Sequence, residues 1–351
     1  MSVQPGQVSS EIDPPSETPG ESPPSGLWRV ASGQLAHNRA AMGALLVLVV
    51  IVAACVAAPL YARYVAHTNP FQFNVSGTTV SDGKTVPVLQ QSTTGLRLGV
   101  TPIGPTWSLS HYFLGADNDG RDVFARLLYG GRTSLVIGAG SAVLCCLLAT
   151  IIALIAGYFG GIVDGVLSRL MDFVWAFPVY LLAISLSVVL LASGGLNVGP
   201  LHLASNSLWV PTLIIAGCYL PYVARPIRGQ VLSLRRSEFV EAAVGVGASD
   251  VRIIFRDLVP NILPTVIVFA PLMMAINMLT ESALSFLSIG VRPPNASWGT
   301  IINDGIGLLY TRPAVTIAPG LALAVVAVAL NVLGDGVREA FDPRGRRFGR
   351  V

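Results

Sequence analysis

Charge is the property that this sequence has least of. Only 12% of its 351 residues are Asp, Glu, Lys or Arg, whereas 52% are hydrophobic. Soluble domains carry about 25% charged residues, so the composition indicates lipid as the main solvent. Lys84 is the only lysine among 22 basic residues, a bias that we attribute to genome composition and not to chemistry.

Residues that catalyse reactions or bind metals are also scarce. The four cysteines lie in apolar runs without metal-ligand spacing, and the four histidines are scattered. Neither H-E-x-x-H nor G-x-S-x-G occurs. The segment DNDGRD (117–122) is not a calcium loop, since its glycine comes too early and Leu128 stands where Glu is needed. We therefore predict no enzyme activity and no bound cofactor, and transport would need energy from elsewhere.

Long uncharged runs, by contrast, are abundant and mark membrane-spanning helices. About 20 apolar residues cross the hydrocarbon core as a helix. Six spans are expected, at 40–62, 133–163, 173–192, 208–226, 263–289 and 314–333. The predicted fold class is an all-α membrane protein with six transmembrane helices.

The distribution of basic residues predicts the orientation. Six spans place both termini on one side, and with that side in the cytoplasm 14 of the 22 basic residues are cytoplasmic. Five of the other eight lie after Arg63 and before the second span, in and next to the long first loop, and long loops count little in the positive-inside rule. We therefore expect cytoplasmic termini, and we attribute the arginine-rich end to the membrane and not to nucleic acid.

The segments outside the spans divide the chain further. Residues 1–27 are rich in Pro, Ser, Gly and Glu, which predicts a disordered cytoplasmic tail. Residues 28–63 would hold the N-terminal segment and first span, and 64–131 an extracytoplasmic loop, either a small hairpin or irregular. Residues 132–337 would form the core with five spans, and 338–351 a basic cytoplasmic tail.

The connector 236–262 lies between two spans but does not look like a simple loop. Its sequence from 237 to 264 is SEFVEAAVGVGASDVRIIFRDLVPNILP. Ser237 suits an N-cap, and Glu238 suits the positive end of the helix dipole. Gly247 can adopt the left-handed conformation that ends a helix. The pattern predicts a short helix, a glycine turn and a second helix.

The second helix of the connector can be capped by Ser249 or Asp250 and is expected to stop at Pro260. On the first helix, small and apolar side chains fall near one face, where a partner could approach closely: Phe239, Ala242, Ala243 and Val246. The alternative is a helix that lies on the bilayer surface.

Glu281 is the one acidic residue inside an apolar span. A charge at mid-membrane costs about 3 kcal/mol, so this side chain should face a pore or a neighbouring helix. Two roles remain open. Glu281 either contacts cargo in a translocation path or forms an interhelix hydrogen bond that positions the spans.

The connector resembles the EAA loop of ABC importer permeases, because Glu241-Ala-Ala243 is followed after three residues by Gly247 and thirteen residues later by Pro260. Asp257, where the family often has an apolar residue, is a departure. Five further segments resemble the C-type subunit of the dipeptide/oligopeptide permease family: LGADNDGRDVFARLLYGGRTSL (114–135), AGYFGGIVD (156–164), MDFVWAFP (171–178), ESALSFLSIGVRPPNASWG (281–299) and LGDGVREAFDPR (333–344). The resemblance covers roughly residues 28–345, with Ala116, Ala125 and a longer outer loop as further departures.

The resemblance implies a type I ABC importer permease in the bacterial cytoplasmic (inner) membrane. Its implied partners are a second homologous permease, one fused or two separate ATPase subunits that bind ATP and Mg, and an extracytoplasmic peptide-binding protein. The implied ATPase-coupling residues are Ser237, Glu238, Phe239, Val240, Glu241, Ala242, Ala243, Gly247, Ser249 and Asp250.

Three alternatives to peptide import stay open at this point. The same family could import nickel chelates, glutathione or another small solute. A self-sufficient channel or secondary transporter would work without an ATPase, which the EAA-like loop argues against. A membrane enzyme lacks a catalytic constellation.

Overall fold

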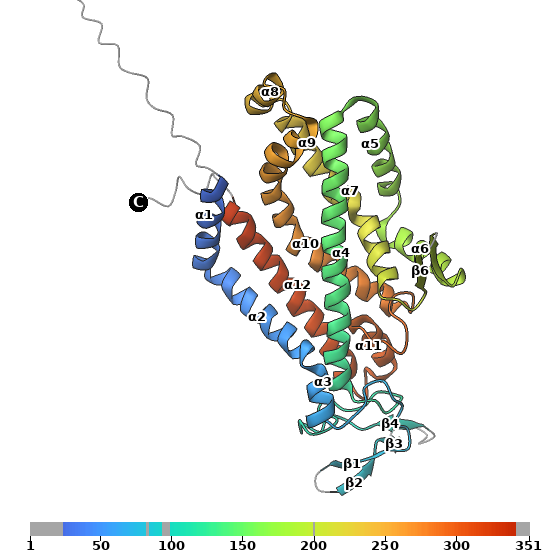
Figure 1. The fold of residues 1–351 in the computed structure, drawn as a ribbon. Coiled ribbons are helices and arrows are strands. Elements are labelled where there is room, and N and C mark those ends of the chain that lie inside the picture. Colours follow the sequence, from blue (N-terminus) through green and yellow to red (C-terminus); the bar gives the residue numbers. More distant parts are fainter. Residues whose placement is uncertain (1–23, 82–83, 93–98, 199–200, 342–351) are drawn as a thin grey trace, which may run out of the picture.

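The computed structural model describes residues 24–81, 84–92, 99–198 and 201–341, so most of the predicted tails 1–27 and 338–351 lies outside these ranges, and residues 338–341 of the second tail belong to a helix. Its long helices run between two ends of the molecule (Figure 1). One end, the hairpin end, carries the strands β1–β4 and helix α11. The other, the α8 end, carries α1, α8, the last turns of α4 and the end of α12. The described chain therefore begins and finishes at the end that carries the connector.

Five helical segments of the described chain are long and apolar enough to cross a membrane: α2 (Arg39–Val56), α4 (Val123–Phe159), α7 (Trp209–Leu234), the continuous run Asp250–Phe286 that ends in α10, and α12 (Ala314–Phe341). Helices α5 (Gly161–Trp175) and α6 (Val179–Ala192) make a sixth span if they are taken together. The predicted helical membrane fold with up to six spans is confirmed.

The third span is not the continuous helix 173–192 that the sequence predicted. Helices α5 and α6 are bent by 88° at the break around Ala176–Pro178. Pro178 has no backbone N–H, and its ring disfavours a helical conformation at the residue before it. Helix α5 is held along α7 by two ion pairs, Arg228 with Asp164 and Arg225 with Asp172.

Helix α4 begins ten residues before the predicted span at 133, so the last part of the expected loop 64–131 is helical. Asp122 caps its start, accepting hydrogen bonds from the N–H groups of Phe124 at 2.9 Å and Ala125 at 3.0 Å. Arg126 interrupts the apolar run in the sequence, but its side chain is buried among carboxylates. Because its charge is paired with carboxylates, Arg126 is compatible with a continuous helix. The hydropathy pattern of the sequence does not show this ion pairing.

The predicted stop of the second connector helix at Pro260 is wrong. The chain passes without interruption from α9 (Asp250–Arg252) through a π-helical turn, η2 (Ile253–Leu258), into α10 (Val259–Phe286). Proline is tolerated in the first turn of a helix, and the wider π turn before it changes the hydrogen-bond register that an α-helix would impose. The second helix of the connector and the fifth span are thus one rod.

The N-terminal region starts with α1 (Pro24–His37), so the expected tail 1–27 is too long by four residues. Asn38 separates α1 from α2 and accepts a hydrogen bond from the N–H of Ala41 at 3.1 Å. After α2, a short helix α3 (Ala58–Leu60) and a π turn η1 (Tyr61–Val65) lead into the long first loop.

In the described residues, strands occur only as short antiparallel hairpins. In the loop 64–131, β1 (Thr78–Ser81) pairs with β2 (Lys84–Pro87), and β3 (Leu89–Gln91) pairs with β4 (Val100–Pro102). This confirms the hairpin alternative for that loop. A third hairpin, β5 (Gly195–Val198) and β6 (Leu201–Ala204), follows α6. Helix α11 (Trp298–Gly305) and a 3-10 turn, η3 (Ile306–Leu308), close the hairpin end.

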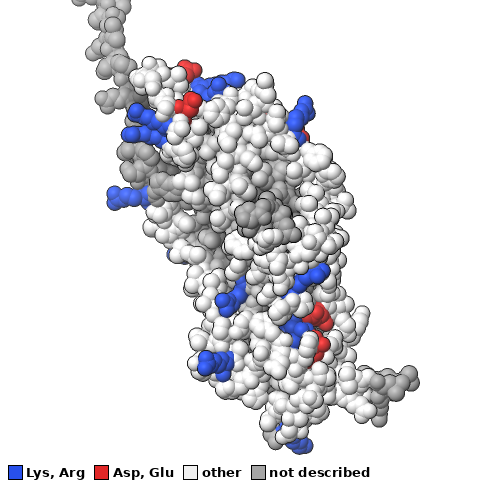
Figure 2. Space-filling model, turned by 45° about the vertical axis from the view of Figure 1, so that its right-hand side comes forward, with Lys and Arg blue, Asp and Glu red and all other residues white. Residues whose placement is uncertain are grey.

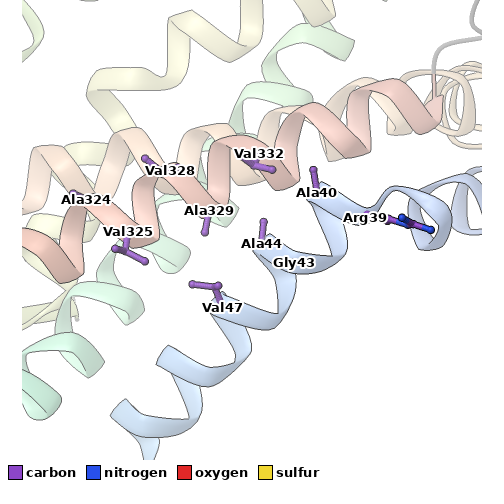
Figure 3. A pocket seen from close by; sticks show the side chains of 10 residues that line it. All are labelled: Arg39, Ala40, Gly43, Ala44, Val47, Ala324, Val325, Val328, Ala329 and Val332. Carbon is purple, nitrogen blue, oxygen red and sulfur yellow. The ribbon is translucent and has the colours of Figure 1, made fainter.

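The packing core lies where α4 meets α7 and α10, and α12 packs on both α10 and α2. Charged side chains gather toward the two ends of the molecule, and a band between them is nearly free of charge on the face in Figure 2. Apolar side chains of α2 and α12 line a groove of about 470 Å³ (Figure 3), with Arg39 at its edge. An uncharged band with apolar flanks suits contact with lipid chains.

Candidate functional site

The first helix of the connector, α8 (Glu238–Gly245), projects at the α8 end (Figure 1). Ser237 stands at its N-cap position, but its hydroxyl donates to the carbonyl of Leu234 at 2.5 Å and does not cap the helix. Of the two predicted caps for the following helix, Ser249 has that role, accepting from the N–H of Arg252 at 3.4 Å.

Gly247 ends α8 as the sequence predicted. Its φ is +77°, in the left-handed region, and no atom lies within 4 Å of where a Cβ would stand. The neighbouring N–H of Ala248 donates to the carbonyl of Ala243 at 3.0 Å. The position therefore requires glycine for its backbone conformation and not for lack of space.

The side chains of α8 divide into a buried and an exposed set. Val240 is 2% exposed and belongs to the main core, and the half-buried Ala243 packs against the same core. Ala243 thus lies on the inner side and not on the predicted partner face. The exposed side holds Ala242 and the apolar side chains of Phe239 and Val246.

Two acidic residues, Glu238 and Glu241, extend the exposed side of α8. Within the described parts of the chain neither carboxylate forms an ion pair or a side-chain hydrogen bond, and both lie in the first turn, where the helix dipole favours negative charge. Asp250, by contrast, accepts a hydrogen bond from the Tyr158 hydroxyl at 2.7 Å, a contact that sequence reasoning missed.

Glu281 is fully buried in α10. Its carboxylate accepts hydrogen bonds from the hydroxyls of Ser134 at 2.8 Å and Ser285 at 2.6 Å. These hydroxyls in turn accept from backbone N–H groups, Ser134 from Trp298 at 3.1 Å and Ser285 from Val291 at 2.9 Å. The carboxylate therefore ties α10 to α4, to the loop after α10 and to the start of α11.

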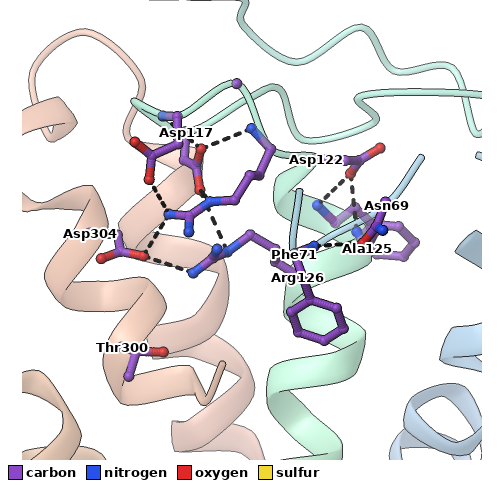
Figure 4. A network of polar contacts seen from close by, with 12 residues as sticks. Asn69, Phe71, Asp117, Asp122, Ala125, Arg126, Thr300 and Asp304 are labelled. Carbon is purple, nitrogen blue, oxygen red and sulfur yellow. Dashed lines mark hydrogen bonds and ion pairs between the residues drawn. The ribbon is translucent and has the colours of Figure 1, made fainter. Parts of the chain in front are cut away.

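A second polar network joins the start of α4 to α11 at the hairpin end (Figure 4). Arg126 contacts Asp304 at 2.7 Å and Asp117 at 3.5 Å, and Arg121 contacts Asp117 at 2.7 Å and Asp304 at 3.1 Å. Burial raises the pKa of the Asp304 carboxyl, and the two guanidinium groups act against that shift. Asp119 completes the network through Arg121.

Asp117 and Asp119 of the DNDGRD segment are thus paired with arginine, whereas Asp122 caps α4. No group of His, Cys, Asp or Glu in the described ranges has the arrangement of a metal site. Beside the network lies a hollow of about 640 Å³, lined by Phe73, Arg121, Arg292 and Asn303 among others. It opens at the hairpin end, opposite to α8.

These features, six potential spans with a structured connector at one end, define a membrane permease subunit. The family model described as "Binding-protein-dependent transport system inner membrane component" matches residues 149–347, and that of the "N-terminal TM domain of oligopeptide transport permease C" matches residues 26–76. The chain belongs to the binding-protein-dependent transport system inner membrane component family, and the predicted resemblance to its peptide permeases is confirmed.

Several relatives share most of the chain. The oligopeptide transport system permease protein OppC of Bacillus subtilis is 33% identical over 92% of this chain and 91% of its own length. The glutathione transport system permease protein GsiD of Pectobacterium atrosepticum is 35% identical over 67% and 73%. A transport system permease protein of Brucella suis is 40% identical over 72% and 78%.

Among solved structures, the inward-facing MetNI methionine ABC transporter is similar over 61% of this chain and 96% of that chain, with 16% identity and a TM-score of 0.49. That likeness is too weak to add to the family assignment. The chain is an inner-membrane ABC transporter permease of the peptide type, and its homologues are non-catalytic subunits that work with other permease and ATPase subunits.

Proposed function

We propose that this chain forms half of the translocation pore of an importer for dipeptides or oligopeptides, with a second homologous permease as the other half. One fused or two separate ATPase subunits would supply the energy from ATP and Mg. An extracytoplasmic peptide-binding protein would deliver the cargo. Family membership and the oligopeptide permease among its relatives support this proposal.

The observation that carries the mechanism is the exposed side of α8. It presents Phe239, Val246 and two carboxylates that have no partner within the described residues, while Val240 anchors the helix in the core. A short rigid helix of this kind fits a groove on an ATPase and can pass on its displacement, which a flexible loop could not do. In this proposal the α8 end, where the described chain begins and finishes, is cytoplasmic.

From α8 the displacement has a continuous route into the membrane. The chain turns at Gly247 and continues as one helical rod from Asp250 to Phe286. Near the far end of this rod, Glu281 binds the groups that hold α4 and α11. Movement at α8 would therefore reach the hairpin end, where we place the entry of cargo.

The complex, purified from its source cells through a tag on this chain and reconstituted with its binding protein, tests the proposed cargo. We expect ATP-dependent uptake of labelled dipeptides or oligopeptides. ATP-dependent uptake of glutathione or of a nickel chelate, without peptide uptake, would favour the alternative cargo, to which the glutathione permease relative points. Uptake without an ATPase would contradict the proposal.

A further inference from the structure

One side-chain hydrogen bond ties the described part of the connector to α4. It runs from the Tyr158 hydroxyl to Asp250 Oδ1 at 2.7 Å, whereas Ser237 and Asn261 of the connector are hydrogen-bonded to α7. Asp250 begins the rod that leads into α10. Tyr158 lies in the last turn of α4 and is 8% exposed.

The surroundings of this contact are open. A hollow of about 350 Å³ separates the end of α4 from α8, and Tyr158, Arg235, Glu241, Val244 and Asp250 are among its lining residues. The hydrogen bond lies at the wall of this hollow and joins α4 to α9, while Tyr158 belongs to the main core.

On the other side, the end of α4 is firmly held. At Gly157, one residue before Tyr158, a Cβ would lie 2.7 Å from the Val231 side chain, so α4 and α7 approach closely there. Tyr158 therefore extends from a well-fixed helix to the first turn of a rod that the proposed function makes movable. The opposite end of α4, toward the hairpin end, carries Ser134, which binds Glu281, and Arg126, which binds Asp304.

We propose that the Tyr158–Asp250 hydrogen bond is a latch that passes movement of the coupling loop to α4 as well as to α10. Tyr158 is then a positioning residue for energy coupling. The proposal rests on the proposed role of α8 in docking an ATPase. With the latch, α4 and α10, which are also joined by the Ser134–Glu281 hydrogen bond, move together. Without the latch, α10 moves alone.

Tyr158→Phe tests the latch, because it removes the hydroxyl and keeps the ring. In proteoliposomes with the purified complex and its binding protein, we expect normal co-purification of the ATPase and continued ATP hydrolysis. The number of peptides transported per ATP should fall at least fivefold. Asp250→Ala should have the same effect, the double variant should lose no more than either single variant, and Asp250→Asn, which keeps the acceptor oxygen, should stay close to the parent.

Tyr310→Phe is the matched control, since Tyr310 is 97% exposed and lies beyond α11. A Tyr158→Phe complex with the parent's ratio of transport to hydrolysis would overturn the proposal. A reduced amount of complex with an unchanged ratio would also overturn it, because the bond would then serve only stability. If Glu241→Lys also behaves like the parent, the docking role of α8 fails, whereas failure of Tyr158→Phe alone rejects only the latch.

Discussion

Single residues with buried charge explain how the helices of this permease are held together. Glu281 would be costly in an apolar span, yet two serine hydroxyls bind its carboxylate and connect it to the backbone N–H groups of two other segments. A buried acceptor with this many donors fixes geometry. The arrangement favours the positioning role over direct contact with cargo, and this remains a prediction.

Glu281→Gln should preserve transport within about threefold, because the amide keeps the volume and one acceptor oxygen. Glu281→Ala should lower the amount of folded protein in the membrane, since it leaves two buried hydroxyls without their acceptor, at about 1–3 kcal/mol each. Uptake per unit of membrane-inserted protein separates the two effects, with Ser282→Ala as the control for its weaker contact at 3.4 Å. Abolished transport at normal protein level in Glu281→Gln would mean that the charge itself is required.

Arg126→Lys should destabilise the hairpin end by about 1–3 kcal/mol. The guanidinium reaches Asp304 and Asp117 together, and a lysine ammonium would leave one of these carboxylates with Arg121 as its only basic partner. The midpoint of thermal unfolding in detergent measures the loss. The exposed Arg63 provides the control variant Arg63→Lys, and equal midpoints for both variants would refute a structural role of the network.

At the scale of elements, the sequence was sufficient for the spans and for the turn at Gly247, because hydropathy and left-handed backbone conformation are local properties. The sequence-based prediction was wrong at Pro178 and at Pro260. Pro178 interrupts the predicted third span, whereas Pro260 lies in the first turn of α10 and does not end the helix. The difference lies in the π turn before Pro260, which depends on the path of the whole rod. The early start of α4 and the contact of Tyr158 depend on distant partners, Asp304 and Asp250, which no local pattern contains.

Gly247→Val should uncouple the transporter, because the left-handed conformation costs a β-branched residue about 1–2 kcal/mol. The open space around Gly247 makes the backbone, and not a steric clash, the cause. Gly247→Asn is the matched control, since asparagine tolerates this region best among the other residues. We expect membrane insertion of both variants, with loss of peptide uptake in the valine variant only. Normal uptake by Gly247→Val would show that the turn can relax without consequence.

For the whole molecule, the described structure places α8, the start of α1 and the end of α12 at one end and the hairpins at the other (Figure 1). In the proposed function, the α8 end is cytoplasmic and contacts the ATPase. The hairpin end is extracytoplasmic and accepts the cargo. For the loop 64–131 the sequence left a hairpin and an irregular structure open, and only the structure showed the hairpins.

The segment before α1 should be dispensable for transport, because its polar, proline-rich composition cannot bury apolar surface. Removal of residues 2–23 leaves α1 intact. We expect membrane insertion, assembly and uptake within about twofold of the parent, measured in the same cells. Loss of the ATPase from the purified complex after this truncation would reveal a role in assembly.

The central claim is that α8 transmits ATPase movement to the spans, and Glu241→Lys tests it most directly. The variant reverses an exposed charge that has no partner within the described chain, and the control Asp335→Lys reverses an exposed charge on α12 at the same end. In reconstituted vesicles, ATP hydrolysis stimulated by the loaded binding protein is measured together with peptide uptake. The account predicts that Glu241→Lys loses both while Asp335→Lys keeps both. Retention of stimulated hydrolysis and uptake by Glu241→Lys would contradict it.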